Sequence, residues 1–231
     1  MAISVSRWVA EVGAVFAKDA RSEFRTRAAL SAILLFALTT LAVVSFSISA
    51  QGLHPVVKAR ILASLLWVVL FFSAMSGLPR VFVKEEDSRT AMALRLAARP
   101  NVVFVGKLLF NVALLLAVTA AVVPLYVILM DPGIQQWGQF VAVLFVGMGG
   151  LAGSATLLAA LVARTSNRGS LFVVLAFPVL LPLLVCAING SVAAFLGTRP
   201  GEAGSNLVVL AAYLVATVTA SLMLFEYVWE D

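Results

Sequence analysis

The chain has 231 residues, of which 62% are hydrophobic and 12% charged, against roughly 45–50% and about 25% in ordinary soluble domains. This composition excludes a water-soluble globular protein and predicts an all-α integral membrane protein, because uncharged stretches of about 20 residues are long enough to cross a bilayer as helices. The net charge of +5 is compatible with nucleic-acid binding, but the positively charged cytoplasmic segments of a membrane protein explain it better.

Residues 4–26 predict a helix that lies along the membrane surface before the first span. Trp8, Val12 and Phe16 recur at four-residue spacing and therefore share one face of a helix. The charged side chains fall on a different face and include Lys18, Arg21 and Arg25. A disordered basic tail is the alternative, since the apolar stripe is short.

Six uncharged stretches predict six transmembrane helices. They are residues 28–50, 61–79, 108–130, 140–163, 169–188 and 207–225. Pro178 and Pro182 lie inside the fifth stretch, where each removes a backbone donor, so we expect a kink or a break halfway along it. Residues 1–231 show no internal repeat and no low-complexity linker, which indicates a single transmembrane domain.

The distribution of basic residues predicts the orientation of the chain. Thirteen of the sixteen Lys and Arg residues lie in the N-terminal segment and in the loops 80–107 and 164–168, which would be on the same side of the membrane as the C-terminal tail. The connecting segments on the opposite side hold the other three. Because basic residues favour the cytoplasmic side, we expect both termini in the cytoplasm.

The loop 80–107 is far longer than a connection between two spans requires. Its acidic run, which ends at Asp87, predicts the start of a helix, because acidic side chains are favoured near the positive end of the helix dipole. Leu94 lies on the apolar face of this helix, and Pro100 predicts its end. A short amphipathic helix across the cytoplasmic end of the bundle would suit a docking surface. The alternative is a solvated surface helix that binds nothing.

Gly149 and Gly153 form a pair of small residues at four-residue spacing inside the fourth predicted span. Such a pair allows two helices to approach closely. The partner helix belongs either to the same chain, which is the commoner arrangement, or to a second copy at a dimer interface.

The spans carry no ionisable residue, which argues against a membrane enzyme and against an ion-coupled carrier. Gly106 and Lys107 resemble the end of a phosphate-binding loop, but Asn101 stands where that motif requires its first glycine. We therefore expect no ATP hydrolysis by this chain and no metal site. If the protein is a transporter, its energy should come from a partner at the cytoplasmic face.

Several short motifs, in order and spacing, resemble the CcmB family, whose members are ABC-2-type permease subunits of the cytochrome c maturation system. The motifs are Lys18-Asp19-x-Arg21-x-Glu23-x-Arg25-x-Arg27, Leu66-Trp67, Gly77-Leu78-x-Arg80-x-Phe82, Gly106-Lys107-Leu108-Leu109-x-Asn111, Arg168-Gly169 and the C-terminal run from Phe225 to Asp231. One motif departs from the family pattern. Phe82 and Glu85 match it, but the expected Asp-Gly pair and leucine are replaced by Ser88, Arg89 and Ala91.

The resemblance implies two permease copies in a bacterial inner membrane, bound to two copies of a CcmA-type ATPase. It also implies CcmC-type, CcmD-type and CcmE-type partners, with heme handled by those partners and ATP and Mg bound by the ATPase, so that this chain binds no cofactor directly. The residues expected to contact the ATPase are Phe82, Glu85, Glu86, Asp87, Arg89, Met92, Leu94, Arg95 and Arg99. The alternatives are a generic ABC-2 exporter of a lipid-linked glycan or hydrophobic compound, and a membrane scaffold without transport.

Overall fold

The structure, a computed structural model, describes residues 5–26, 28–47, 53–87, 90–163, 168–198 and 200–230. These residues form helices and no strand. The helices are α1 (Val5–Thr26), α2 (Ala28–Ser47), α3 (Pro55–Gly77), α4 (Arg80–Asp87), α5 (Ala91–Ala97), α6 (Pro100–Met130), α7 (Trp137–Val162), α8 (Arg168–Leu196) and α9 (Pro200–Glu230).

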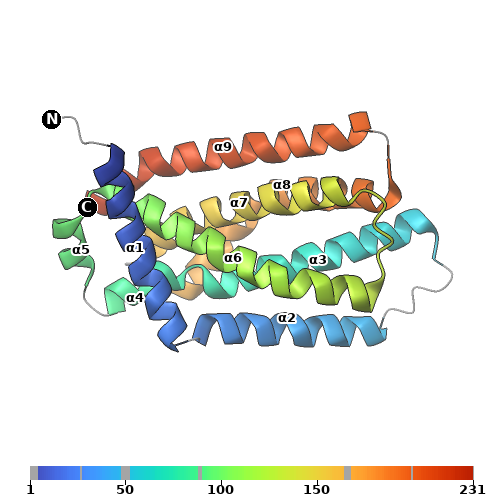
Figure 1. Cartoon of the computed structure of the whole chain (residues 1–231), viewed down its shortest axis with the longest axis horizontal. Helices are drawn as coiled ribbons and strands as arrows, with labels where there is room; N and C mark the ends of the chain where they lie inside the picture. The colour runs from blue at the N-terminus through green and yellow to red at the C-terminus, as the bar shows by residue number, and fades with distance from the viewer. Residues whose placement is uncertain are drawn as a thin grey trace.

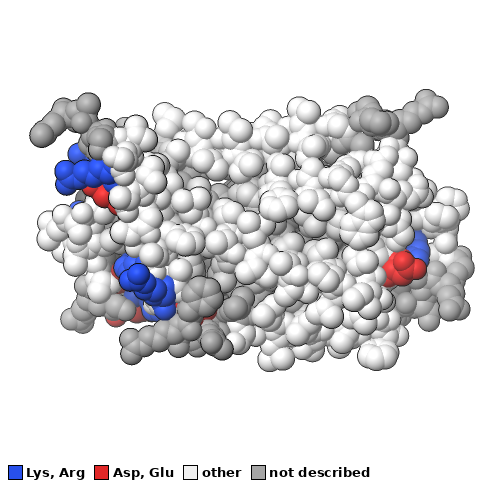
Figure 2. All heavy atoms as spheres, viewed as in Figure 1, with Lys and Arg blue, Asp and Glu red and all other residues white. Residues whose placement is uncertain are grey.

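The long helices run side by side along the length of the molecule, whereas α1 crosses one end of the bundle at a steep angle (Figure 1). The short helices α4 and α5 and both chain termini lie at that same end, which we call the α5 end. Charged side chains are confined to the two ends on the face shown in Figure 2, and the broad band between them is uncharged. A wide uncharged band bounded by charges is typical of a protein that spans a membrane.

Five helical segments of the described chain are long and apolar enough to cross a membrane. They are Pro55–Glu85, Pro100–Met130, Trp137–Val162, Ser170–Leu196 and Gly204–Tyr227. They correspond to the second to sixth predicted spans, whereas α2, the first predicted span, contributes a shorter apolar helix, Ile33–Phe46. The chain is therefore a multi-pass membrane protein.

Two predicted features of the prolines can be compared with the structure. Pro100 follows the end of α5 at Ala97, as predicted, and it also occupies the first turn of α6, where its missing N–H has no helical acceptor to lose. Of the kink or break predicted for the fifth span, the break is absent, because α8 continues through both Pro178 and Pro182. The Tyr213 hydroxyl of α9 donates a hydrogen bond of 2.7 Å to the carbonyl of Val179, which lies between these prolines. This bond joins α9 to the part of α8 between the two prolines.

Helix α7 lies in the middle of the bundle and packs against α3, α4, α6, α8 and α9. Gly147 makes this packing possible, because a Cβ atom there would lie 2.3 Å from the ring of the buried Trp67. The Trp67 indole in turn donates a 2.9 Å hydrogen bond to Ser191 of α8. Gly149 and Gly153 lie against Leu214 and Val218 of α9, so both face a helix of the same chain.

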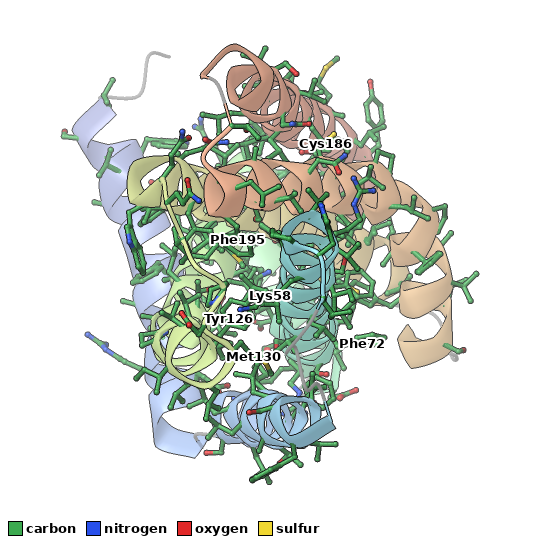
Figure 3. All side chains as sticks on the ribbon, turned by 90° about the vertical axis from the view of Figure 1, so that its right-hand side faces the viewer. Lys58, Phe72, Tyr126, Met130, Cys186 and Phe195 are labelled. Carbon is green, nitrogen blue, oxygen red and sulfur yellow. The ribbon has the colours of Figure 1, made fainter. Side chains whose placement is uncertain are left out.

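The opposite end of the bundle is closed by large side chains. In the view from that end, Tyr126 and Phe195 lie toward the middle of the bundle, whereas Phe72 lies at its margin (Figure 3). Tyr126 is 0% exposed and Phe195 is 2% exposed, against 48% for Phe72. The interior of the bundle is therefore filled by side chains at this end.

Candidate functional site: the α5 end of the bundle

The α5 end contains a lysine that is completely withdrawn from solvent. Lys107, near the start of α6, has a side chain that is 0% exposed. Its Nζ lies 3.3 Å from Asp19 Oδ2 of α1, 3.2 Å from Glu85 Oε1 of α4 and 2.9 Å from the carbonyl oxygen of Val81. An isolated buried ammonium would be very costly, and these three acceptors compensate its charge. The side chain therefore ties α1, α4 and α6 together.

A second lysine completes this group. Lys18 of α1 pairs with Glu85 and lies 3.5 Å from Asp19, and Thr90 donates a 2.6 Å hydrogen bond to the other Glu85 oxygen. We call Lys18, Asp19, Glu85 and Lys107 the ion cluster. It holds two positive and two negative charges, so it is neutral as a whole when all four groups are ionised.

Gly106 allows α1 to cross α6 closely enough for the ion cluster to form. A Cβ atom at this position would lie 2.7 Å from the Cβ of Val15 and 3.2 Å from the carbonyl oxygen of Val12. Three buried valines, Val12, Val15 and Val102, form a small apolar cluster at the crossing. Glycine at 106 is thus required by backbone proximity rather than by phosphate binding.

An aromatic cluster lies beside the ion cluster. It consists of Phe82, Phe104, Phe225 and Trp229, with ring centroids 5.1–6.4 Å apart. The ammonium of Lys107 lies 5.0 Å from the centre of the Phe82 ring, a cation–π contact that joins the two clusters. The same aromatic cluster connects α4 and α6 with the C-terminal turn of α9.

Helix α5 rests on this aromatic cluster through Arg95. The guanidinium carbon lies 5.3 Å from the centre of the Trp229 ring. Helix α5 also carries two exposed apolar side chains, since Met92 is 65% and Leu96 85% exposed. Exposed apolar side chains on a short helix that packs against a buried cluster are suited to bind another protein.

The predicted contact residues in loop 80–107 separate into buried and exposed groups. Phe82 and Glu85 are 3% and 7% exposed and contribute to the two clusters. Leu94 is half-buried and packs against the core of its own chain, so its contact with the ATPase stays a prediction. Met92, Asp87 and Arg99 are exposed. Arg89 and the side chain of Glu86 lie outside the described residues.

The acidic run does not begin a helix, as the sequence predicted, but ends α4 at Asp87. Glu85 therefore sits in the last turn, where the helix dipole disfavours a carboxylate. Its ion pairs with Lys18 and Lys107 offset this effect. Tertiary contacts thus override the local preference that made the acids look like a helix start.

The apolar stripe predicted for α1 packs mainly against α6. Val12 is buried, Trp8 packs beside it, and the Phe16 ring lies 6.5 Å from that of Phe110. Lys18 turns into the ion cluster, whereas Arg21 is exposed. The side chain of Arg25 lies outside the described residues.

Sequence reasoning missed the ion cluster, because its members are far apart in the chain. Lys18, Asp19 and Lys107 belong to two of the motifs that carry the family resemblance, but those motifs did not indicate that the three side chains meet. In the structure Asn111 donates a 2.8 Å hydrogen bond to Thr156 of α7. Within the described ranges, no three His, Cys, Asp or Glu side chains gather as a metal-ligand group.

Comparison with known proteins gives one family. Residues 10–226 match the family model described as CcmB protein. The match includes α2 to α8 in full and most of α1 and α9, and it contains the ion cluster and all of the aromatic cluster except Trp229. No curated protein matches the chain.

Proposed function

The chain belongs to the CcmB family, the membrane permease component of a heme exporter in cytochrome c maturation, and we propose that it couples ATP hydrolysis by a partner ATPase to a conformational change of its helix bundle. The observation that carries this proposal is the exposed apolar pair Met92 and Leu96 on α5. Arg95 of the same helix contacts Trp229 of α9. Contacts of Trp229, Phe82 and Lys107 then connect α9 with α4, α6 and α1.

The proposed topology has six spans, with both termini in the cytoplasm of a bacterial cell and the protein in the inner membrane. Helix α2 forms the first span, since its 20 residues correspond to about 30 Å of helix. The α5 end then faces the cytoplasm, in agreement with the thirteen basic residues assigned to that side.

The proposed complex contains two copies of this permease and two copies of a CcmA-type ATPase, with CcmC-type, CcmD-type and CcmE-type partners. ATP and Mg bind to the ATPase, and the partners handle heme. Movement of the ATPase reaches the bundle through α5, because Arg95 contacts Trp229 of α9. The aromatic cluster then connects Trp229 with Phe82 of α4, and Phe82 with Lys107 of α6.

The docking role of α5 is tested by co-purification of the CcmA-type ATPase with Met92→Asp/Leu96→Asp. Introducing carboxylates into an apolar interface is costly, since each must lose its hydration, and the loss of well-buried interface side chains commonly costs about 2 kcal/mol or more each. We expect loss of the ATPase and of c-type cytochrome maturation at normal membrane levels of the permease.

Val5→Asp is the matched control, because Val5 is 77% exposed but belongs to α1. It should retain the ATPase. If the double variant on α5 also retains the ATPase in full and cytochrome maturation continues, α5 is not the docking element. Stimulation of ATP hydrolysis by the assembled complex separates a coupled permease from a scaffold.

A further inference from the structure

A cavity of about 440 Å³ lies at the α5 end, between α1, α3, α4, α5 and α6. Its volume is within the range of about 300–1,000 Å³ that is usual for small-molecule sites. The cavity shares Lys18, Asp19 and Glu85 with the ion cluster, but most of its wall is formed by other residues.

The two parts of the wall differ in chemistry. The inner part is apolar and includes Gly77, Phe110 and Leu114, all within segments that are apolar enough to span a membrane. The outer part is lined by charged side chains of α1 and α4. The cavity therefore extends from the apolar band of the bundle to its charged end, as the binding site of an amphiphilic molecule should.

The outer part carries a small excess of positive charge once its ion pairs are counted. Asp19 and Glu85 pair with Lys18 and with Lys107, which lies behind the lining. The lining then holds one further acid, Glu23, and two further cations, Arg80 and Lys84. These two cations lie one turn apart on α4 and hence on the same face of that helix.

The partners of these two cations are weak. Among the residues that the structure describes, Lys84 donates a hydrogen bond to the neutral hydroxyl of Ser22 and forms no ion pair, and Arg80 has neither a hydrogen bond nor an ion pair. Arg80 and Lys84 thus offer a positively charged mouth to an apolar cavity, and basic pockets between transmembrane helices are typical binding sites for anionic lipid headgroups.

We propose that this cavity binds one anionic phospholipid of the membrane leaflet on the α5 side. Its phosphate lies between Arg80 and Lys84, where it accepts charge-assisted hydrogen bonds. The start of an acyl chain lies against Phe110 and Leu114. The lipid would fill the space between α1 and α4 next to the ion cluster, so it would support the crossing of α1 over the bundle. This site is distinct from the exposed face of α5 and does not depend on which protein binds there.

The test is native mass spectrometry of the delipidated protein titrated with dioleoylphosphatidylglycerol. We expect one tightly bound lipid per chain and roughly tenfold weaker binding by Arg80→Gln/Lys84→Gln, since one charge-assisted hydrogen bond can account for about a factor of ten. Ala97→Leu is the second variant. It fills the cavity from the exposed helix α5 and should weaken binding without any change of charge.

Lys58→Gln/Arg60→Gln is the matched control, because it also removes two cations, at the opposite end of α3. It should bind the lipid as the unaltered chain does. Dioleoylphosphatidylcholine should bind more weakly than phosphatidylglycerol, and glycerol 3-phosphate should not displace the bound lipid. Unchanged binding by both cavity variants, an equal loss in the control, or displacement by glycerol 3-phosphate would each overturn the lipid site.

Discussion

Replacing the buried lysine of the ion cluster should destabilise the protein more than any other charge substitution at the α5 end. In Lys107→Met, the carboxylates of Asp19 and Glu85, which are only 10% and 9% exposed, lose their buried partner. Breaking a buried ion pair by removing one member costs roughly 3–5 kcal/mol. Lys18 is 46% exposed and still pairs with Glu85, so we expect the lower end of that range, about 3 kcal/mol.

The measurement is reversible unfolding in mixed micelles with an increasing fraction of a denaturing detergent. Lys58→Met is the control, because Lys58 is half-buried and forms no ion pair with the described residues. It should change the unfolding free energy by less than about 0.5 kcal/mol. The triple variant Asp19→Asn/Glu85→Gln/Lys107→Met should regain much of the lost stability. Replacing all members of a buried ion group by uncharged residues often changes the stability little. Equal stabilities of Lys107→Met and Lys58→Met would refute the burial of Lys107.

Three further results are expected. Gly106→Ala should lower the unfolding free energy by about 1–3 kcal/mol through overpacking, whereas Gly13→Ala, where a Cβ meets no atom within 4 Å, should be neutral or stabilising in the same unfolding assay. Trp229→Ala removes a buried ring stacked 5.3 Å from Phe225 and should cost roughly 3–5 kcal/mol; Trp229→Phe should lose clearly less, and equal losses would contradict the stacking. Reporter tags near Arg95 should be accessible only from the cytoplasm and tags near His54 only from the outside; the reverse pattern would invert the proposed orientation.

The membrane class and most helices could be predicted from the sequence, because hydropathy acts locally and each span carries its own signal. Helix ends were less predictable. The sequence placed the start of the third span at residue 108, but α6 begins at Pro100 and includes Lys107. A rule that ends a span at a charge fails here, since the charge is neutralised by α1 and α4.

The candidate site could be predicted only in part. The amphipathic character of the segment around Leu94 was visible, but the face that it exposes was not, because α5 is short and begins at Ala91, after the acidic run. Leu94 then turns inward and Leu96 outward. The ion cluster joins residues 88 and 22 positions apart, and no local pattern encodes such a pairing.

Under the proposed function, the two clusters connect α5, which is only seven residues long, with four other helices. Its Arg95 contacts α9, the aromatic cluster joins α9 to α4 and α6, and Lys107 joins α6 to α1. Packed side chains shift between discrete arrangements rather than deform continuously. A displacement of α5 that keeps these contacts must therefore move the ends of α1, α4, α6 and α9 together. Under the proposed function, the Arg95–Trp229 contact therefore carries part of the movement of a bound ATPase from α5 to α9, beside the packing of Leu94 against the core.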